Sequence, residues 1–207
     1  MQIDAAALGP QQAYKLLTGA VVPRPIAWVT SLSPQRVLNL APFSAFTFVS
    51  TKPPMIGINI GRKAGVMKDT GANIHATGEF VVNIPDADLI EAVHLSAVEH
   101  PPEISEPELL GLQTLASVFV QVPRLAAAPI AMECKLHRAI AFGDTGSEFV
   151  VGEIRMFHVR DGLGENGRID AARLRPICRL GGPNYGLLGE IVRLAPVAQT
   201  PKTVLKG

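Results

Sequence analysis

Residues 23–60, PRPIAWVTSLSPQRVLNLAPFSAFTFVSTKPPMIGINI, decide the fold class of this chain. They contain four apolar, β-prone runs, separated by short polar or proline-marked breaks. The pair Ser33-Pro34 predicts a turn after the first run, and Lys52-Pro53-Pro54 predicts an extended link before the fourth. Strands joined by such short breaks pair as antiparallel neighbours. We predict strands over residues 26–31, 37–40, 44–50 and 55–60.

The rest of the chain adds further strands and a few helices. Strands are predicted over 79–84, 116–122, 130–142, 148–159 and 190–194, with a hairpin turn at 143–146 (GDTG). Helices are predicted over 5–19, with Leu16 and Leu17 inward, over about 69–77, capped by Asp69 or Thr70 and closed by Gly78, and over roughly 87–99. The proline- and glutamate-rich residues 100–112 are expected to form an exposed excursion.

This order of elements favours a mainly β fold. A parallel α/β sheet needs a helix after almost every strand, and here most strands follow one another directly. We therefore predict an antiparallel Greek-key barrel with two to three peripheral helices. The chain has 207 residues and no linker-like segment, so we expect one domain over 1–207 with its core at about 14–195.

The composition excludes several functional classes. A formal net charge of +1 provides no field to hold nucleic acid or an anionic membrane. No run of 18 or more apolar residues is present, and MQIDAAALGP at the start does not resemble a signal peptide. Cys134 and Cys178 are far apart and form no CxxC pair, which is typical of free thiols in a reducing compartment. We therefore expect a cytoplasmic protein.

Residues 61–73, GRKAGVMKDTGAN, form a basic segment that leads into a predicted helix. Arg62, Lys63 and Lys68 lie beside a helix start at Asp69-Thr70. Free backbone N–H groups and the positive end of the helix dipole favour a phosphate there, and cationic side chains add to it. The alternative, a solvated basic turn, stays open on spacing alone.

A second set consists of small polar and apolar residues near the strand ends. Flavin rings need hydroxyl, amide and backbone groups along the pyrimidine edge and apolar surface against the dimethylbenzene end. The polar candidates are Thr30, Ser31, Asn39 and Ser44, and the apolar ones are Ile26, Trp28, Phe46 and Phe48. Together with the basic segment they suggest a flavin mononucleotide (FMN) site. Taken alone, they also fit ordinary turn, edge and core positions.

Other kinds of site have less support. The five histidines are scattered, without HxH or HExxH spacing, so we expect no metal site. Ser44 lies in APFSAF, which is not the GxSxG motif of a hydrolase nucleophile. The glycines of RLGGPNYGLLG do not form the GxGxxG motif after a strand that indicates a dinucleotide fold.

Four segments resemble the flavin reductase-like, flavoredoxin-type family. They are TGAVVPRPIAWVTS, NLAPFSAFTFVSTKPPMIGINI, KDTGAN with FVVNI, and RLGGPNY, in this order and nearly filling residues 14–190. The resemblance implies an FMN-binding split β-barrel and a homodimer in which FMN lies near the dimer interface. One departure is the turn in SLSPQRVLN, where relatives often have an Asn-Gly or Asp-Gly pair.

By motif position, the resemblance also implies which residues contact FMN. Those near the ring or the ribityl chain are Arg24, Pro25, Ile26, Trp28, Thr30 and Ser31. Those lining the isoalloxazine ring are Asn39 and the segment 42–47, which includes Ser44, Ala45, Phe46 and Thr47. Those holding the phosphate are Arg62, Lys68 and Thr70, with Lys63 as a weaker candidate. Arg179 and Tyr185, in the segment RLGGPNY, are candidates for contact with the cofactor region or with a neighbouring subunit.

The function implied is that of an NAD(P)H:flavin oxidoreductase. The protein would bind FMN, accept a hydride from NADH or NADPH and pass electrons to a further acceptor, a protein among the candidates. Hydride transfer needs no protein acid or base, so no catalytic side chain is expected. Two alternatives stay open: an electron carrier that a partner protein reduces, and a barrel that has lost flavin binding.

Overall fold

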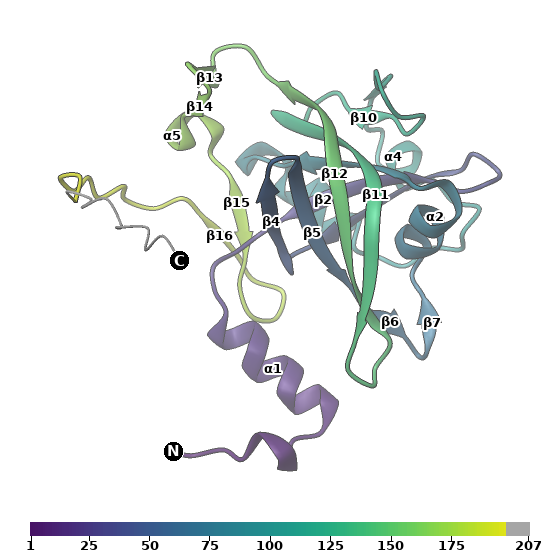
Figure 1. The fold of residues 1–207 in the computed structure, drawn as a ribbon, viewed down its shortest axis with the longest axis vertical. Coiled ribbons are helices and arrows are strands. Elements are labelled where there is room, and N and C mark those ends of the chain that lie inside the picture. The colour runs from purple at the N-terminus through teal and green to yellow at the C-terminus, as the bar shows by residue number, and fades with distance from the viewer. Residues whose placement is uncertain (198–207) are drawn as a thin grey trace, which may run out of the picture.

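Seven antiparallel strands form the central sheet of the computed structural model, which describes residues 1–197 (Figure 1). Residues 198–207 of the predicted domain lie outside the described residues. The strand order is β3-β2-β8-β11-β12-β5-β4, with bounds β2 Ala27–Leu32, β3 Leu38–Phe43, β4 Phe46–Thr51, β5 Pro54–Ile60, β8 Glu79–Ile84, β11 Ile130–Phe142 and β12 Ser147–Val159. β3 and β4 end the order and do not pair with each other, so the barrel is split. The mainly β, antiparallel split-barrel prediction is confirmed.

Strand β2 is buried on both of its faces. Successive side chains of a strand point to opposite faces. Val29 packs in one buried cluster with Ile58 and Phe80, whereas Trp28 packs in a second cluster with Leu40 and other apolar residues. Every residue of β2 is consequently buried.

Four small sheets surround the barrel. The one that matters most for the site has the order β1-β15-β16, with bounds Arg24–Pro25, Ile177–Arg179 and Tyr185–Leu187, and it joins two distant parts of the sequence. In its antiparallel register Arg24 lies directly opposite Arg179. The other pairs are β6 Arg62–Lys63 with β7 Val66–Met67, β9 Thr114–Leu115 with β10 Arg124–Leu125, and β13 Gly164–Glu165 with β14 Arg168–Ile169.

Helix α1 (Pro10–Ala20) stands away from the central sheet (Figure 1). None of its residues is buried, and Leu16 and Leu17 are 42% and 63% exposed. The prediction that both leucines point inward is therefore wrong for the single chain, because no sheet face lies beneath this helix. A one-turn 3-10 helix, η1 (Ala5–Ala7), precedes it.

Helix α2 (Asp69–Thr77) lies where the sequence predicts it. Gly78 ends it in the left-handed conformation at φ +70°, which a glycine adopts without the steric cost of a Cβ atom. The N-cap position is Lys68, not Asp69 or Thr70, and no side chain caps the first turn. The open first turn leaves backbone N–H groups without intrahelical partners.

The predicted helix over 87–99 is shorter and divided. It consists of η2 (Ala87–Leu89) and α3 (Ile90–Leu95). The Ser96 hydroxyl donates to the Val93 carbonyl at 3.0 Å and accepts from the Trp28 ring nitrogen at 2.8 Å. A serine side chain that bonds to nearby backbone competes with helix continuation, and here it coincides with the helix end.

Residues 100–112 are not an exposed excursion throughout. They contain α4 (Glu106–Leu109), and Ser105, Glu106 and Pro107 are buried. The Glu106 carboxylate accepts hydrogen bonds from the backbone of Leu40 and the side chain of Asn39, which draws this segment onto β3. The prediction from the glutamate-rich composition, that residues 100–112 are exposed, is therefore wrong for residues 105–107.

Two predicted strands are absent from the described residues. Residues 116–122 form no strand, because the buried Glu133 carboxylate accepts the backbone N–H groups of Val118, Phe119 and Val120. Residues 190–194 are irregular, and their apolar side chains Ile191, Val192 and Leu194 are exposed. The strands of this region are β15 and β16, which lie earlier in the sequence.

The structure bears on several smaller expectations. The hairpin turn at 143–146 joins β11 to β12 as predicted. Two helices of four residues, α4 and α5 (Ala171–Leu174), add to the two to three that were predicted. Both cysteines are free thiols. Within residues 1–197, no helix has the length and apolar character needed to cross a membrane.

Candidate functional site

Two adjoining hollows open beside strand β3. The first, which we call the arginine pocket, has a volume of about 190 Å³ and is lined by Tyr14, Thr18, Arg24, Ile26, Pro42, Phe43, Ser44, Ala97, Arg179, Leu180, Gly182 and Tyr185. The second, the lysine pocket, has about 390 Å³ and is lined by 39, 41–43, 63, 64, 66–70, 96–100 and 106. Pro42, Phe43 and Ala97 line both, so the pockets share a wall.

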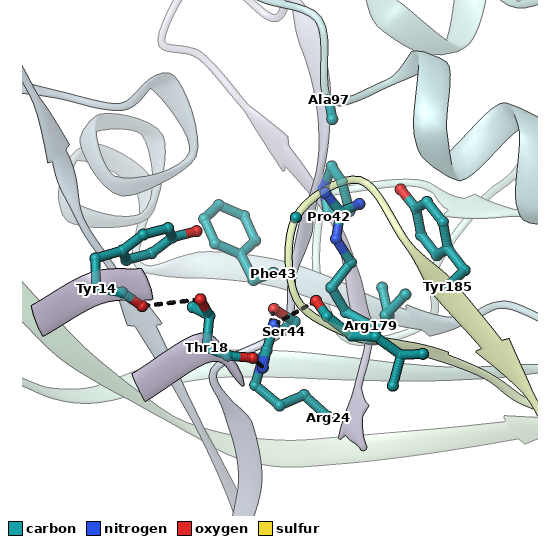
Figure 2. A pocket seen from close by; sticks show the side chains of 12 residues that line it. Tyr14, Thr18, Arg24, Pro42, Phe43, Ser44, Ala97, Arg179 and Tyr185 are labelled. Carbon is teal, nitrogen blue, oxygen red and sulfur yellow. Dashed lines mark hydrogen bonds between the residues drawn. The ribbon is translucent and has the colours of Figure 1, made fainter. Parts of the chain in front are cut away.

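Arg24 holds the floor of the arginine pocket together. Its guanidinium donates to the carbonyls of Thr18 at 2.5 Å and Leu180 at 2.9 Å and to the Ser44 hydroxyl at 3.3 Å (Figure 2). It also donates to the Val21 carbonyl at 2.7 Å. These groups come from the end of α1, from the β3–β4 link and from the segment after β15. Arg24 is buried, so its positive charge is used to join three parts of the chain.

Arg179 and Tyr185 form another side of the arginine pocket. The Arg179 guanidinium lies 4.5 Å from the centroid of the Tyr185 ring, a cation–π contact. The Tyr185 hydroxyl lies 3.3 Å from Nδ1 of His94, and the two rings meet edge to face at 84°. Figure 2 shows Tyr185 on the opposite side of the pocket from Tyr14. His94 thus fixes the ring on which Arg179 stacks.

A buried polar network forms the wall of the lysine pocket next to β3. The Asn39 side-chain oxygen accepts the Thr70 hydroxyl at 2.8 Å and the Ser31 hydroxyl at 3.3 Å. The Asn39 amide nitrogen donates to both Glu106 oxygens, at 3.2 and 3.1 Å. Asn73 donates to Ser31 at 3.2 Å. The network ties the start of α2 to strand β3 and to α4.

Both cationic and anionic side chains line the lysine pocket. Lys68 is exposed, with Nζ 5.8 Å from the centroid of the Phe43 ring. Lys63 forms an ion pair with Glu99. Asp69 and Glu106 also line the pocket. Lys68 is consequently the cation of this pocket that no carboxylate pairs within the described residues.

A third hollow, the β-face groove, lies on strands β4, β5 and β12. It has about 590 Å³ and is lined mainly by apolar residues, among them Pro25, Phe46, Phe48, Met55 and Phe157. Phe48 is 75% exposed and Phe157 is 50% exposed. The groove does not share a lining residue with the arginine pocket or the lysine pocket.

The structure distributes the fourteen sequence-predicted site residues over several places. Arg24, Ile26 and Ser44 line the arginine pocket, Asn39, Lys68 and Thr70 line the lysine pocket, and Pro25, Phe46 and Thr47 line the β-face groove. Trp28, Thr30 and Ser31 are buried in β2 and line no pocket, and Ala45 is exposed outside all three hollows.

Two side chains predicted to contact FMN, those of Thr30 and Arg62, bind other groups of the protein instead. The Thr30 hydroxyl donates to the Pro123 carbonyl at 2.8 Å. Arg62 donates to the carbonyls of Gly146 and Gly65 and lies 3.7 Å from Glu148. Arg62 therefore turns toward the β11–β12 hairpin and does not line the lysine pocket.

Several pocket residues escaped the sequence reasoning. Tyr14 and Thr18 lie on a helix that the pattern assigned to the protein core, and Glu106 lies in a segment assigned to solvent. Residues 96–100 follow α3 and line the lysine pocket. Only RLGGPNY, which contains Arg179 and Tyr185, provided a signal, and no single-sequence pattern places the others.

The buried ionisable groups outside the pockets have a structural role. Burial alone raises the pKa of the Glu133 carboxyl, but hydrogen bonds from His158 and from the backbone of Val118 and Phe119 outweigh it, so this pKa lies below its ordinary value. Burial, and then the charge of Glu133, raise the pKa of the Cys134 thiol. Among residues 1–197, no three His, Cys, Asp or Glu side chains lie together as a metal site requires.

Comparison with protein families identifies the domain. A family model described as flavin reductase like domain matches residues 19–174. The matched residues stop before β15, so Arg179 and Tyr185 lie beyond this match.

Three solved structures are similar over nearly the whole chain. Nitrilotriacetate monooxygenase component B from Bacillus cereus is 42% identical, with a TM-score of 0.91 over 94% of this chain and 98% of that one. The 2-nitrobenzoate 2-nitroreductase NbaA from Pseudomonas fluorescens is 37% identical, with a TM-score of 0.87 over 98% and 100%. A split-barrel protein from Shewanella frigidimarina is 21% identical, with a TM-score of 0.82 over 95% and 100%, and shows the shared fold.

Proposed function

The chain belongs to the flavin reductase-like family, and from this premise we propose that it binds FMN and passes electrons from NADH or NADPH through it to a further acceptor. The observation that carries the proposal is the pair of adjoining pockets beside β3, with cations in each and a polar network between β3 and α2. The relatives include a nitroreductase and a monooxygenase component, which supports a flavin-related oxidoreductase.

The lysine pocket fits the phosphate and the ribityl chain of FMN. Its volume of about 390 Å³ lies within the range of roughly 300–1,000 Å³ that small-molecule sites have. Lys68 and the open first turn of α2 would hold the phosphate, with the Thr70 hydroxyl beside them. Asn39 would position the ribityl hydroxyls. Arg62 is left out of this proposal because it does not line the lysine pocket and its side chain contacts Gly65, Gly146 and Glu148 instead.

The shared wall fits the flavin ring. Pro42 and Phe43 provide apolar surface at the junction of the two pockets, as an isoalloxazine ring requires. Ile26 and Ser44 line the arginine pocket together with Pro42 and Phe43, and we propose that both contact the ring. The ring would then separate the lysine pocket from the arginine pocket, which is left for a second molecule.

FMN, when bound, supplies the group that accepts and donates hydride. The chain's own residues bind and orient. Lys68 would offset part of the phosphate charge, the Asn39 network fixes the start of α2, and Pro42 and Phe43 would exclude water from one side of the ring. Orientation of this kind accounts for a large share of catalysis in cofactor enzymes, so the absence of an assigned acid or base agrees with the chemistry.

We also propose a homodimer. Helix α1 has no buried residue, and the β-face groove exposes Phe48 and Phe157, so the isolated chain presents a large apolar surface. A second copy that covers this surface through a two-fold contact would bury it. Sedimentation velocity at micromolar concentration tests this, and a monomer there would contradict it. The cytoplasmic location stays a prediction.

The proposal is tested by an absorption spectrum of the protein with FMN, recorded anaerobically before and after NADH or NADPH. We expect a flavin band that bleaches with at least one nucleotide. A band that persists with both would indicate the carrier alternative. A protein that neither binds FMN nor changes its fluorescence would contradict the flavin proposal.

A further inference from the structure

The guanidinium of Arg179 has unused hydrogen-bond donors. Within residues 1–197 it forms no ion pair and no side-chain hydrogen bond, and its one assigned contact is the Tyr185 ring at 4.5 Å. Stacking on a ring engages the face of the guanidinium, whereas its five N–H donors lie in the plane. The donors therefore remain available to a ligand in the arginine pocket.

The arginine pocket holds an uncompensated positive charge. Two arginines line it, and no aspartate or glutamate does. Arg24 and Arg179 are direct partners in the β1–β15 ladder, so their side chains leave the sheet on the same face. Like charges directly opposite each other in an antiparallel pair are destabilising. An anion between or beside them would offset this repulsion.

The two arginines differ in what they can offer. The Arg24 guanidinium donates hydrogen bonds to three backbone carbonyls and one hydroxyl, which leaves it little capacity for a ligand. Arg179 is held in place only by its stacking on Tyr185, whose hydroxyl is in turn positioned by His94. A planar guanidinium with free edges suits a carboxylate, which it can bind through two parallel hydrogen bonds. Ile26, Pro42 and Phe43 add apolar surface to the pocket.

The size of the pocket limits what the anion can belong to. Its volume of about 190 Å³ is below the range of roughly 300–1,000 Å³ typical of sites for larger ligands, so one ring with one anionic group fits better than a dinucleotide. The pocket meets the proposed flavin ring at Pro42, Phe43 and Ala97. A molecule held there would lie against the face of that ring.

We propose that the arginine pocket binds the second substrate and selects a planar, single-ring carboxylate, with Arg179 as the residue that determines this specificity. The role of this pocket as a substrate site depends on the proposed flavin function. Its preference for an anion does not depend on FMN, because it comes from Arg179. The strand pair that carries Arg179 and Tyr185 lies beyond the residues matched by the family model.

Two probes of equal shape test the selectivity: benzoate, which is an anion, and benzamide, which is neutral. Their binding is measured by ligand-observed NMR on the full chain, with and without FMN. The native protein is expected to bind benzoate about tenfold more tightly than benzamide, because a charge-assisted hydrogen bond contributes roughly this ratio. Arg179→Gln is expected to reduce the ratio to about one. Arg173→Gln, on α5 outside both pockets, is the matched control and should leave it unchanged.

The same variants separate this site from the cofactor site. FMN affinity, read by flavin fluorescence, should change less than about twofold in Arg179→Gln. A large loss of FMN affinity would place Arg179 at the flavin phosphate and overturn the proposal. So would equal binding of benzoate and benzamide, or an unchanged ratio in Arg179→Gln.

One more variant, and the measurement without FMN, distinguish a failure of the anion site from a failure of the flavin proposal. Arg179→Lys retains the charge but lacks the planar fork, so we expect a ratio between those of the native protein and Arg179→Gln. If FMN does not bind but the benzoate preference depends on Arg179, the flavin proposal fails and the anion site stands. Displacement of FMN by benzoate would show that both compete for one site and would contradict the arrangement.

Discussion

The arginine pocket and the lysine pocket share three lining residues but differ in their charge balance. Two arginines and no carboxylate line the first, whereas Lys63 and Lys68 share the second with Asp69, Glu99 and Glu106. In the lysine pocket, Lys63 pairs with Glu99, and neutral donors from Asn39 and Leu40 hydrogen-bond to the Glu106 carboxylate. The arginine pocket has no internal anion.

The two arginines of that pocket show that charge and availability are separate properties. Arg24 is buried and uses four of its five N–H donors within the protein, so its charge serves the fold. Arg179 contacts the Tyr185 ring and has no assigned hydrogen bond among the described residues, so its charge is available to the proposed ligand. The comparison teaches that cations in a pocket should be counted by their free donors rather than by their number.

The largest expected effect separates the two arginines by stability. Arg24→Met removes the donor of three part-buried carbonyls, and at about 1 kcal/mol for each hydrogen bond we expect a loss of about 3 kcal/mol in the free energy of unfolding. Arg179→Met removes mainly a cation–π contact, with an expected loss of about 1 kcal/mol or less. Urea denaturation measures both, and equal losses would remove the distinction.

A buried carboxylate outside both pockets provides the next test. Glu133→Gln replaces one of the two acceptor oxygens by an NH2 group, so the side chain can no longer accept from all three backbone N–H groups and His158. We expect a loss of about 2 kcal/mol at pH 7 with unchanged FMN and benzoate affinities. The exposed Glu165→Gln is the control.

The pH dependence of this effect has a defined sign. The folded-state pKa of Glu133 lies below its ordinary value of 4.5, so its contribution is present above that value and is lost as the pH falls through the folded pKa. The native protein and Glu133→Gln should therefore become more alike in stability under acidic conditions. Urea denaturation at pH 7 and at pH 3 checks this, and a constant difference would contradict it.

Lys68 tests the lysine pocket. Lys68→Gln is expected to raise the dissociation constant of FMN about tenfold, because the phosphate loses a charge-assisted partner. Riboflavin, which lacks the phosphate, should be affected less than about twofold. Lys63→Gln should have the smaller effect, since Lys63 already pairs with Glu99. Fluorescence titration measures these constants, and an equal loss for riboflavin would move the phosphate away from Lys68.

The smallest effect concerns the charge balance itself. Glu99→Gln frees Lys63 and should tighten FMN binding by about twofold at low salt, with the gain disappearing at high salt. Benzoate binding in the arginine pocket should not change. Titration at two ionic strengths checks both statements, and a tightening of benzoate as well would show that the two pockets are electrostatically one.

Much of the fold could be predicted from the sequence. Runs such as EFVVNI (79–84) contain enough β-branched and apolar residues to specify strands, and glycines at 78, 143 and 146 specify where elements end. The failures have tertiary causes. Residues 116–122 have strand composition, but Glu133 takes their N–H groups. Residues 100–112 look solvated, but Asn39 and Leu40 provide partners for Glu106.

The candidate site was less predictable than the fold. Asn39, Lys68 and Thr70 meet in one pocket as motif position implied, although their contact with FMN stays a prediction. Thr30 and Trp28 lie on β2, which is buried on both faces, so the alternation of strand side chains could not show which of them faces a ligand. Arg62 lies in a basic segment that favours a phosphate site, but its side chain contacts Gly146 and Glu148 instead of lining the lysine pocket.

The β1–β15 pairing has a consequence for the synthesis of the chain. Every residue that lines the lysine pocket has been translated by residue 106, whereas the arginine pocket needs Arg179, Leu180, Gly182 and Tyr185. A product that terminates after residue 174 therefore carries the complete lining of one pocket and lacks a wall of the other. The wall formed by Arg179 and Tyr185 is thus absent from any chain that is released before residue 185 is translated.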